Sequence, residues 1–170
     1  ASSIPVKQPK KLPIESENVQ KIRSQIQNWI REYQLVKLIP LFSMQNSHYK
    51  ASYKYLQPEE YLHIFCYQFL KTYHSKDVFV WHTENEGKRN TVRKCISQMM
   101  GLTEGISDLI IQRKSIENYP LLIVELKIKG NYPTPAQKQF LEFQKSIGND
   151  CHVIYDFPSF LEVFVRWFNG

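Results

Sequence analysis

Two apolar segments in the second half of the chain constrain its fold more than any other feature of the sequence. Residues 108–114 (DLIIQRK) and 121–130 (LLIVELKIKG) have the length and the branched side chains of buried β-strands. The six residues between them, SIENYP, include Asn118 and Pro120, which favour turns. We therefore predict that the two segments pair as an antiparallel hairpin.

The second of these segments is interrupted by two charged residues, Glu125 and Lys127. Side chains two positions apart on a strand share one face, so the two charges point together, away from Val124, Leu126 and Ile128. One explanation is an ordinary ion pair on a sheet face that is open to water. The other is a functional site that requires both charges.

The remaining elements follow from apolar periodicity and from capping residues. Strands are predicted at 78–82 and 151–156, with Thr134 and Gly148 expected to start and end one of the helices. The predicted helices span residues 19–38, 58–73, 86–100, 134–148 and 157–170. This order indicates an α/β fold, a mixed β-sheet flanked by helices. We expect a flexible basic tail at 1–15, a helical extension at 16–77 and the α/β domain at 78–170.

Composition and charge limit the class of protein. The chain has 170 residues with 22 Lys and Arg against 16 Asp and Glu, a net charge of +6, which favours polyanionic partners. Cys66, Cys95 and Cys151 lie in apolar periodic segments and are expected to be reduced core residues. These features predict an intracellular protein, nuclear if the source is eukaryotic. No apolar run approaches the length of a membrane helix, so no membrane partner is expected.

Three acids stand near the ends of predicted elements: Glu86, Asp108 and Glu125. The hairpin can bring Asp108 and Glu125 together, and Mg²⁺ takes a few carboxylates plus water as ligands. Such an ion supports hydrolysis of a phosphodiester by polarising the phosphoryl oxygens and activating water. Lys127 could then steer or deprotonate the attacking water, or stabilise the charge that develops on the phosphate.

At this point the sequence resembles the viral replication and repair nuclease family, VRR-NUC, of the PD-(D/E)XK nucleases. The resemblance covers Val78 to Gly170 and rests on four segments in order: HTENEGKRN (82–90), GLTEGISDLII (101–111), LLIVELKIKG (121–130) and TPAQKQFLEFQKSIG (134–148). Asn85 and Gly105 also match signature positions. The family usually has proline before the aspartate, whereas Ser107 precedes Asp108 here.

The resemblance implies roles for five residues and a cofactor, Mg²⁺ or Mn²⁺. Asp108 and Glu125 would be the metal ligands, and Glu86 would be the helix acid near the metal. Lys127 would be the catalytic lysine, and Gln137 the supporting glutamine.

Each of these residues also has a purely structural explanation. Gln137 lies three residues after Thr134, so the two can form a capping box. Asp108 could cap a turn after Gly105. Glu86, at the start of a helix, would complement the helix dipole.

The sequence therefore predicts a divalent-metal-dependent DNA endonuclease that selects duplex or branched DNA by structure and not by base sequence. The alternative is a non-cleaving DNA-binding accessory subunit of a larger DNA-modifying complex, for example an adenine methyltransferase assembly. A protein partner on the N-terminal helices and a homodimer are further possibilities. The predicted phosphate contacts, which could equally be solvated helix residues, are Lys88, Arg89, Arg93, Lys94, Lys129 and Lys138.

Overall fold

The computed structural model describes residues 16–43, 56–83, 91–100 and 105–170. Its elements, in chain order, are α1 (Glu17–Glu32), η1 (Val36–Leu38), α2 (Ile39–Phe42), α4 (Pro58–Tyr73), β1 (Val78–His82), α5 (Thr91–Met99), β2 (Leu109–Arg113), β3 (Leu122–Leu126), α6 (Pro135–Ser146), β4 (Asp150–Ile154) and α7 (Phe157–Asn169).

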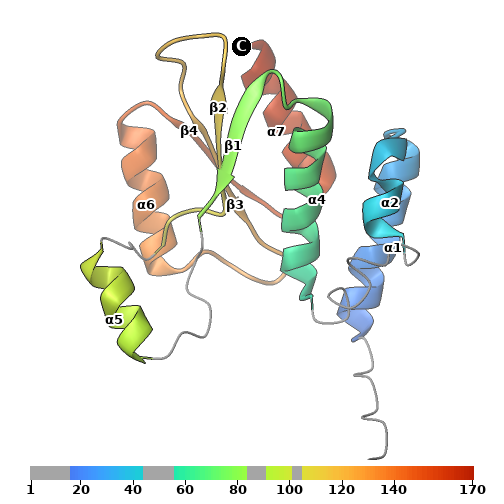
Figure 1. Cartoon of the computed structure of the whole chain (residues 1–170), viewed down its shortest axis with the longest axis horizontal. Coiled ribbons are helices and arrows are strands. Elements are labelled where there is room, and N and C mark those ends of the chain that lie inside the picture. The colour runs from blue at the N-terminus through green and yellow to red at the C-terminus, as the bar shows by residue number, and fades with distance from the viewer. Residues whose placement is uncertain (1–15, 44–55, 84–90, 101–104) are drawn as a thin grey trace, which may run out of the picture.

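The four described strands form one mixed sheet in the order β1-β2-β3-β4 (Figure 1). β1 pairs with β2, and β2 with β3, in antiparallel fashion, whereas β3 and β4 are parallel. Leu109 lies opposite Val124 in the predicted hairpin. The predicted mixed α/β architecture and the antiparallel hairpin are therefore confirmed.

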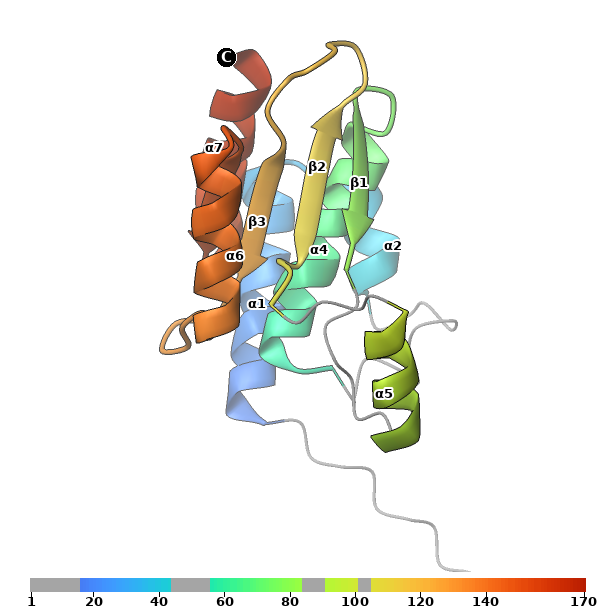
Figure 2. The same cartoon turned by 90° about the vertical axis from the view of Figure 1, so that its left-hand side faces the viewer.

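Helices cover both faces of this sheet, as Figures 1 and 2 show. α4 and α7 lie on one face and α6 on the other. The larger core contains Leu109, Leu122 and Val124 of the sheet together with apolar side chains of α1, α4 and α7. The smaller core, under α6, is built from Ile110, Ile123, Leu141 and Cys151. Because both faces are covered, all five residues of β3 are buried.

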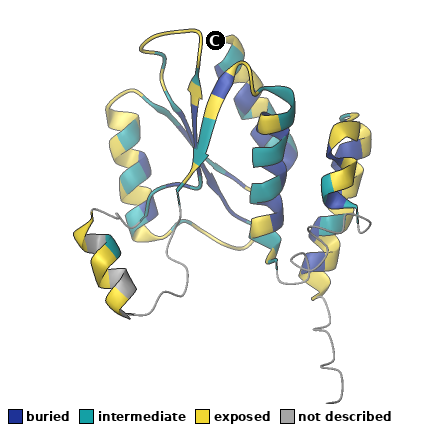
Figure 3. Cartoon of the chain, in the orientation of Figure 1, coloured by how far each residue is buried: buried dark blue, intermediate teal, exposed yellow. Residues whose placement is uncertain are grey.

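α1 belongs to the larger core, although the sequence left open whether residues 16–77 pack on the sheet domain. The Trp29 ring lies 5.8 Å from the Phe65 ring of α4 and 6.0 Å from the Phe157 ring of α7, measured between centroids. Ile26 and Ile30 on the same helix face are also buried. Figure 3 shows that this face of α1 turns toward the rest of the molecule.

The first helix ends earlier than predicted, at Glu32 and not at Leu38. Gln34 takes a left-handed conformation with φ 55°, and the Leu35 N–H donates to the carbonyl oxygen of Ile30 over 2.8 Å. This is the hydrogen bond of a Schellman C-cap, which usually employs glycine. The apolar pattern continues through the break, so periodicity alone could not reveal it.

The helix predicted at 86–100 is described only from Thr91 onward, and its apolar stripe is not part of the core. Val92, Ile96 and Met99 are exposed, as is Cys95. The expectation of a buried Cys95 is therefore wrong, whereas the other two cysteines are buried as predicted. The helix lies beyond one end of the sheet and covers neither face (Figures 1 and 2), so its periodicity indicates amphipathic character but not burial. Among the described helices, none has the length and apolar character needed to cross a membrane.

Candidate functional site

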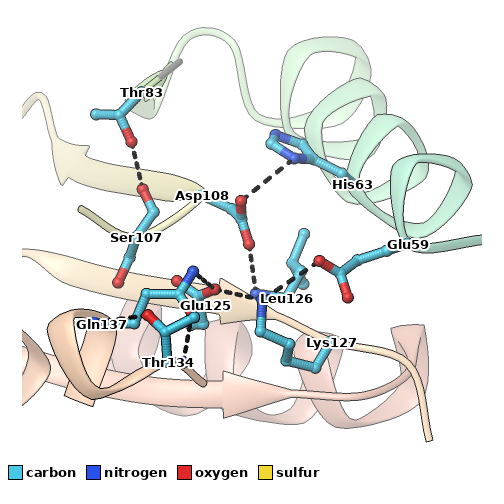
Figure 4. A network of polar contacts seen from close by, with 10 residues as sticks. All are labelled: Glu59, His63, Thr83, Ser107, Asp108, Glu125, Leu126, Lys127, Thr134 and Gln137. Carbon is cyan, nitrogen blue, oxygen red and sulfur yellow. Dashed lines mark hydrogen bonds and ion pairs between the residues drawn. The ribbon is translucent and has the colours of Figure 1, made fainter. Parts of the chain in front are cut away.

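Asp108 and Glu125 meet at one end of the sheet because of the hairpin register. Asp108 directly precedes β2, and continuing the pairing of Leu109 with Val124 by one residue places it opposite Glu125. The Asp108 Oδ2 atom accepts a hydrogen bond of 2.8 Å from the backbone N–H of Leu126 (Figure 4). Asp108 therefore joins the two strands and does not merely cap the turn after Gly105.

The side chains of Glu125, in β3, and of Lys127, just after it, come together as the alternation predicts. The Lys127 Nζ atom lies 2.7 Å from Oε1 of Glu125, and the two residues are only 8% and 0% exposed. A pair so deeply buried is not the solvated ion pair that the sequence allowed. Removing two charges from water is costly, so a buried pair of this kind is weak evidence for stability.

The Gln137 side chain fulfils both roles that the sequence allowed. Its Oε1 atom accepts from the Thr134 N–H over 2.8 Å, which closes the predicted capping box at the start of α6. Its Nε2 atom donates to Oε1 of Glu125. An amide can do both because it carries one acceptor and one donor group. Gln137 therefore ties the first turn of α6 to the buried acid of β3.

Two site residues come from α4 and were missed by the sequence analysis. Glu59, in the first turn, places Oε1 3.3 Å from the Lys127 Nζ atom. The His63 Nδ1 atom lies 3.9 Å from Oδ1 of Asp108. Glu59 and His63 are four positions apart on a helix, a spacing that puts both on one face and could have signalled a shared site. Assigning residues 16–77 to an extension hid that signal.

The electrostatics of the cluster differ from those of an exposed site. Burial raises the pKa of Glu125 to about 7, the charge of Asp108 acts in the same direction, and Lys127 opposes both. Burial lowers the pKa of Lys127, but the hydrogen bond and charge of Glu125 outweigh this and raise it above its ordinary value. Lys127 is therefore a fixed cation at neutral pH, suited to stabilising negative charge and not to accepting a proton.

His63 is neutral at pH 7. Burial lowers its pKa to about 4, with a further contribution from His82, whose ring centroid is 4.4 Å away. The contact between His63 and Asp108 is consequently not an ion pair at neutral pH.

The loop before β2 fits closely against α6. Gly105 has φ +80°, and a Cβ atom on it would lie 2.6 Å from the carbonyl carbon of Ala136. The Ser107 carbonyl oxygen accepts from the Thr83 hydroxyl over 2.6 Å. Glycine is therefore required at position 105 both by the backbone conformation and by the close approach of α6. This tight fit of the loop against α6 helps to position Asp108.

The acids present fit a hard divalent cation in part. Oε2 of Glu125 is buried and has no hydrogen-bond partner among the described residues, and the hairpin register places Asp108 opposite Glu125. Mg²⁺ needs only one or two carboxylates when water completes its shell. Within the described part of the chain, however, no group of three or more acidic, histidine or cysteine side chains is arranged to hold a metal.

The other predicted residues are not brought into the cluster by any described contact. Glu86, together with Asn85, Lys88 and Arg89, lies outside the described residues. Arg93 and Lys94 belong to α5, but their side chains are not described. Lys129 and Lys138 are exposed, and they lie after β3 and in the first turn of α6, respectively.

Comparisons with known proteins do not assign the chain to a family. No protein-family model, curated protein or solved structure matches it. The main structural indication of a function is the carboxylate cluster, which we define as Glu59, Asp108, Glu125, Lys127 and Gln137.

Proposed function

We propose that the protein is a nuclease-like α/β domain of PD-(D/E)XK type that hydrolyses DNA with Mg²⁺ or Mn²⁺. The observation that carries the proposal is the burial of Glu125, opposite Asp108 and 2.7 Å from the Lys127 ammonium through Oε1, with no partner for Oε2 in the described part of the chain. A residue selected only for stability would not be placed there, because an unpaired buried carboxylate oxygen costs free energy. The mixed sheet with its acids on adjacent strands is consistent with this fold type.

The roles follow from the contacts of each side chain. Asp108 and Glu125 would hold the metal ion, which supplies Lewis-acid polarisation of the phosphate and a more acidic bound water. Gln137 binds Oε1 of Glu125, whereas Oε2 has no hydrogen-bond partner among the described residues. Lys127 keeps its proton and stabilises negative charge on the phosphate. The exposed Lys129 would contact the backbone of the DNA.

A second candidate is the non-cleaving DNA-binding subunit. The observation in its favour is that Lys127 lies between two carboxylates, 2.7 Å from Glu125 and 3.3 Å from Glu59, so the cluster is partly neutralised by its own lysine. Such a cluster can persist as a scaffold whether or not a cation enters it. Both candidates require a DNA-binding surface, but only the first requires the metal.

The experiment that separates them measures Mn²⁺ binding and cleavage together. Isothermal titration of Mn²⁺ into the wild-type protein is compared with the same titration into Asp108→Asn, which preserves shape and removes a ligand charge. In parallel, flapped, branched and plain duplexes are incubated with both proteins in Mn²⁺. The proposal expects binding and cleavage by wild type and loss of both in the variant.

Two results would refute the proposal that the protein is a nuclease. Absence of Mn²⁺ binding by wild type, with DNA binding intact, would favour the scaffold. Equal cleavage by wild type and Asp108→Asn would show that the activity comes from a contaminant. Lys145→Ala, an exposed substitution in the last turn of α6, serves as the control because it lies far along the helix from Gln137.

A further inference from the structure

A groove of about 690 Å³ lies near the carboxylate cluster. It runs between α1 and the segments that follow β3 and β4. Pro58 and Ile128 line it, and they are the sequence neighbours of Glu59 and Lys127. The groove is therefore close to the cluster, although none of the five cluster residues is among those that line it.

The side chains along this groove combine cationic, aromatic and neutral polar groups. Lys21 of α1 and Lys129 after β3 are both exposed, and Gln25 lies one turn along α1 from Lys21. Tyr132 is 76% exposed and Tyr155 is 38% exposed, and neither ring is packed into the two described cores. Two accessible rings beside two lysines match the combination that binds phosphates and stacked bases.

We propose that this groove binds a single-stranded segment of nucleic acid that leads away from the carboxylate cluster. Rings can stack only on bases whose faces are uncovered, and in a duplex each face is covered by the next base pair. Tyrosines at the groove therefore favour unpaired bases, whereas lysines alone would accept a duplex equally well. The inference deepens the proposed function, on which it rests, by naming the unpaired strand as the part of the substrate that is held.

One acid, Asp156, also lines the groove and would oppose a phosphate. Its Oδ1 atom accepts a hydrogen bond of 2.8 Å from the Ser159 N–H, so it is the N-cap of α7. The positive end of the helix dipole offsets part of its charge. The two lysines therefore keep the groove net cationic.

The test measures equilibrium binding without cleavage. The whole chain is titrated in EDTA against labelled oligothymidylate of roughly 12 nucleotides, within the site sizes common for unpaired strands. An oligouridylate and a duplex of equal length are titrated in parallel. We expect tighter binding of the unpaired strands than of the duplex, and the two oligonucleotides show whether the strand is DNA or RNA.

The variants assign this binding to the groove. Tyr132→Ala and Tyr155→Ala should each weaken binding to the unpaired strand about tenfold, as expected for loss of one stacked base. Lys129→Ala should lower the slope of log affinity against log salt by about 0.7. The matched controls, Phe143→Ala and Lys145→Ala, change an exposed ring and an exposed cation on α6 and should leave binding unaltered.

The outcomes separate the two proposals. If both tyrosine variants bind like wild type, or if polyglutamate of similar charge binds as well as the oligonucleotide, the groove is not a site for unpaired bases. If wild type binds the unpaired strand through the tyrosines but cleaves nothing in Mn²⁺, the groove is supported and the nuclease fails. If cleavage is intact and depends on Asp108 while the groove variants bind the unpaired strand like wild type, the proposed nuclease activity is supported and the proposed groove site is refuted.

Discussion

The pH dependence of stability gives a quantitative test of the buried carboxylate. The perturbation is Glu125→Gln, which keeps the shape and an acceptor for Gln137 and Lys127 but removes the titrating proton. Glu125 has a folded pKa of about 7 against an ordinary value of 4.5. Because its folded pKa is raised, its contribution to stability is fully present below pH 4.5 and is lost as pH rises through 7.

The magnitude follows from linkage. One pKa unit corresponds to roughly 1.4 kcal/mol, so between pH 5 and pH 7 Glu125 removes about 2 kcal/mol from the free energy of unfolding. His63 acts in the opposite direction, because its pKa falls from 6.5 to about 4 on folding. Its contribution is present above pH 6.5 and lost as pH falls toward 4, and over the same interval it adds about 2 kcal/mol.

The two residues therefore nearly cancel in the wild-type protein. We expect Glu125→Gln to gain about 2 kcal/mol relative to wild type as pH rises from 5 to 7, whereas His63→Gln should lose about as much. The assay is urea unfolding at a series of pH values in EDTA, and groups common to both proteins cancel in the difference. Parallel profiles for wild type and Glu125→Gln would refute the raised pKa and the reasoning built on it.

Three further predictions concern the framework of the site. Gly130 has a positive φ but open space around it, so Gly130→Ala should lower the free energy of unfolding by roughly 1–2 kcal/mol. Gly105→Ala should lower it at least twice as much in urea unfolding, because the new Cβ would also clash with α6. Equal losses in the two variants would contradict the close fit to α6. Trp29→Ala should lower the free energy of unfolding by about 3–5 kcal/mol, because the ring joins α1 to the core. Val36→Ala, at an exposed position, should change the urea midpoint little. A small effect of the tryptophan substitution would mean that α1 does not pack on the core. Gln137→Glu keeps the helix cap but places a second carboxylate next to the buried Glu125. The melting temperature should therefore fall more at pH 8 than at pH 5 relative to wild type. A fall in melting temperature that does not vary with pH would exclude this contact.

The fold was largely predictable from the sequence because local signals agreed with tertiary structure in the second half of the chain. The hairpin of β2 and β3 was found from two apolar runs around a turn, and α6 from its Thr134 cap and Gly148 stop. The end of α1 was not predicted, because Gln34 has a left-handed backbone conformation that is unusual for glutamine.

The site was predictable only where its members are close in the chain or linked by the hairpin. Glu125 and Lys127 share a face by alternation, and pairing brings Asp108 to them. Glu59 and His63 come from a helix more than forty residues earlier, and no local pattern shows that its first turns reach the end of the sheet. Their place depends on how α4 packs over β3, which is a property of the whole fold.

The hydrogen bond from Gln137 to Glu125 couples the motion of α6 to the position of the buried acid. The same amide closes the first turn of α6 and binds the acid, so the two contacts are coupled. A fluctuation that frays this turn would also break the Gln137 contact and leave Oε1 of Glu125 bound to Lys127. Amide hydrogen exchange at Gln137, whose N–H donates to the Thr134 hydroxyl, would therefore report how often this contact opens.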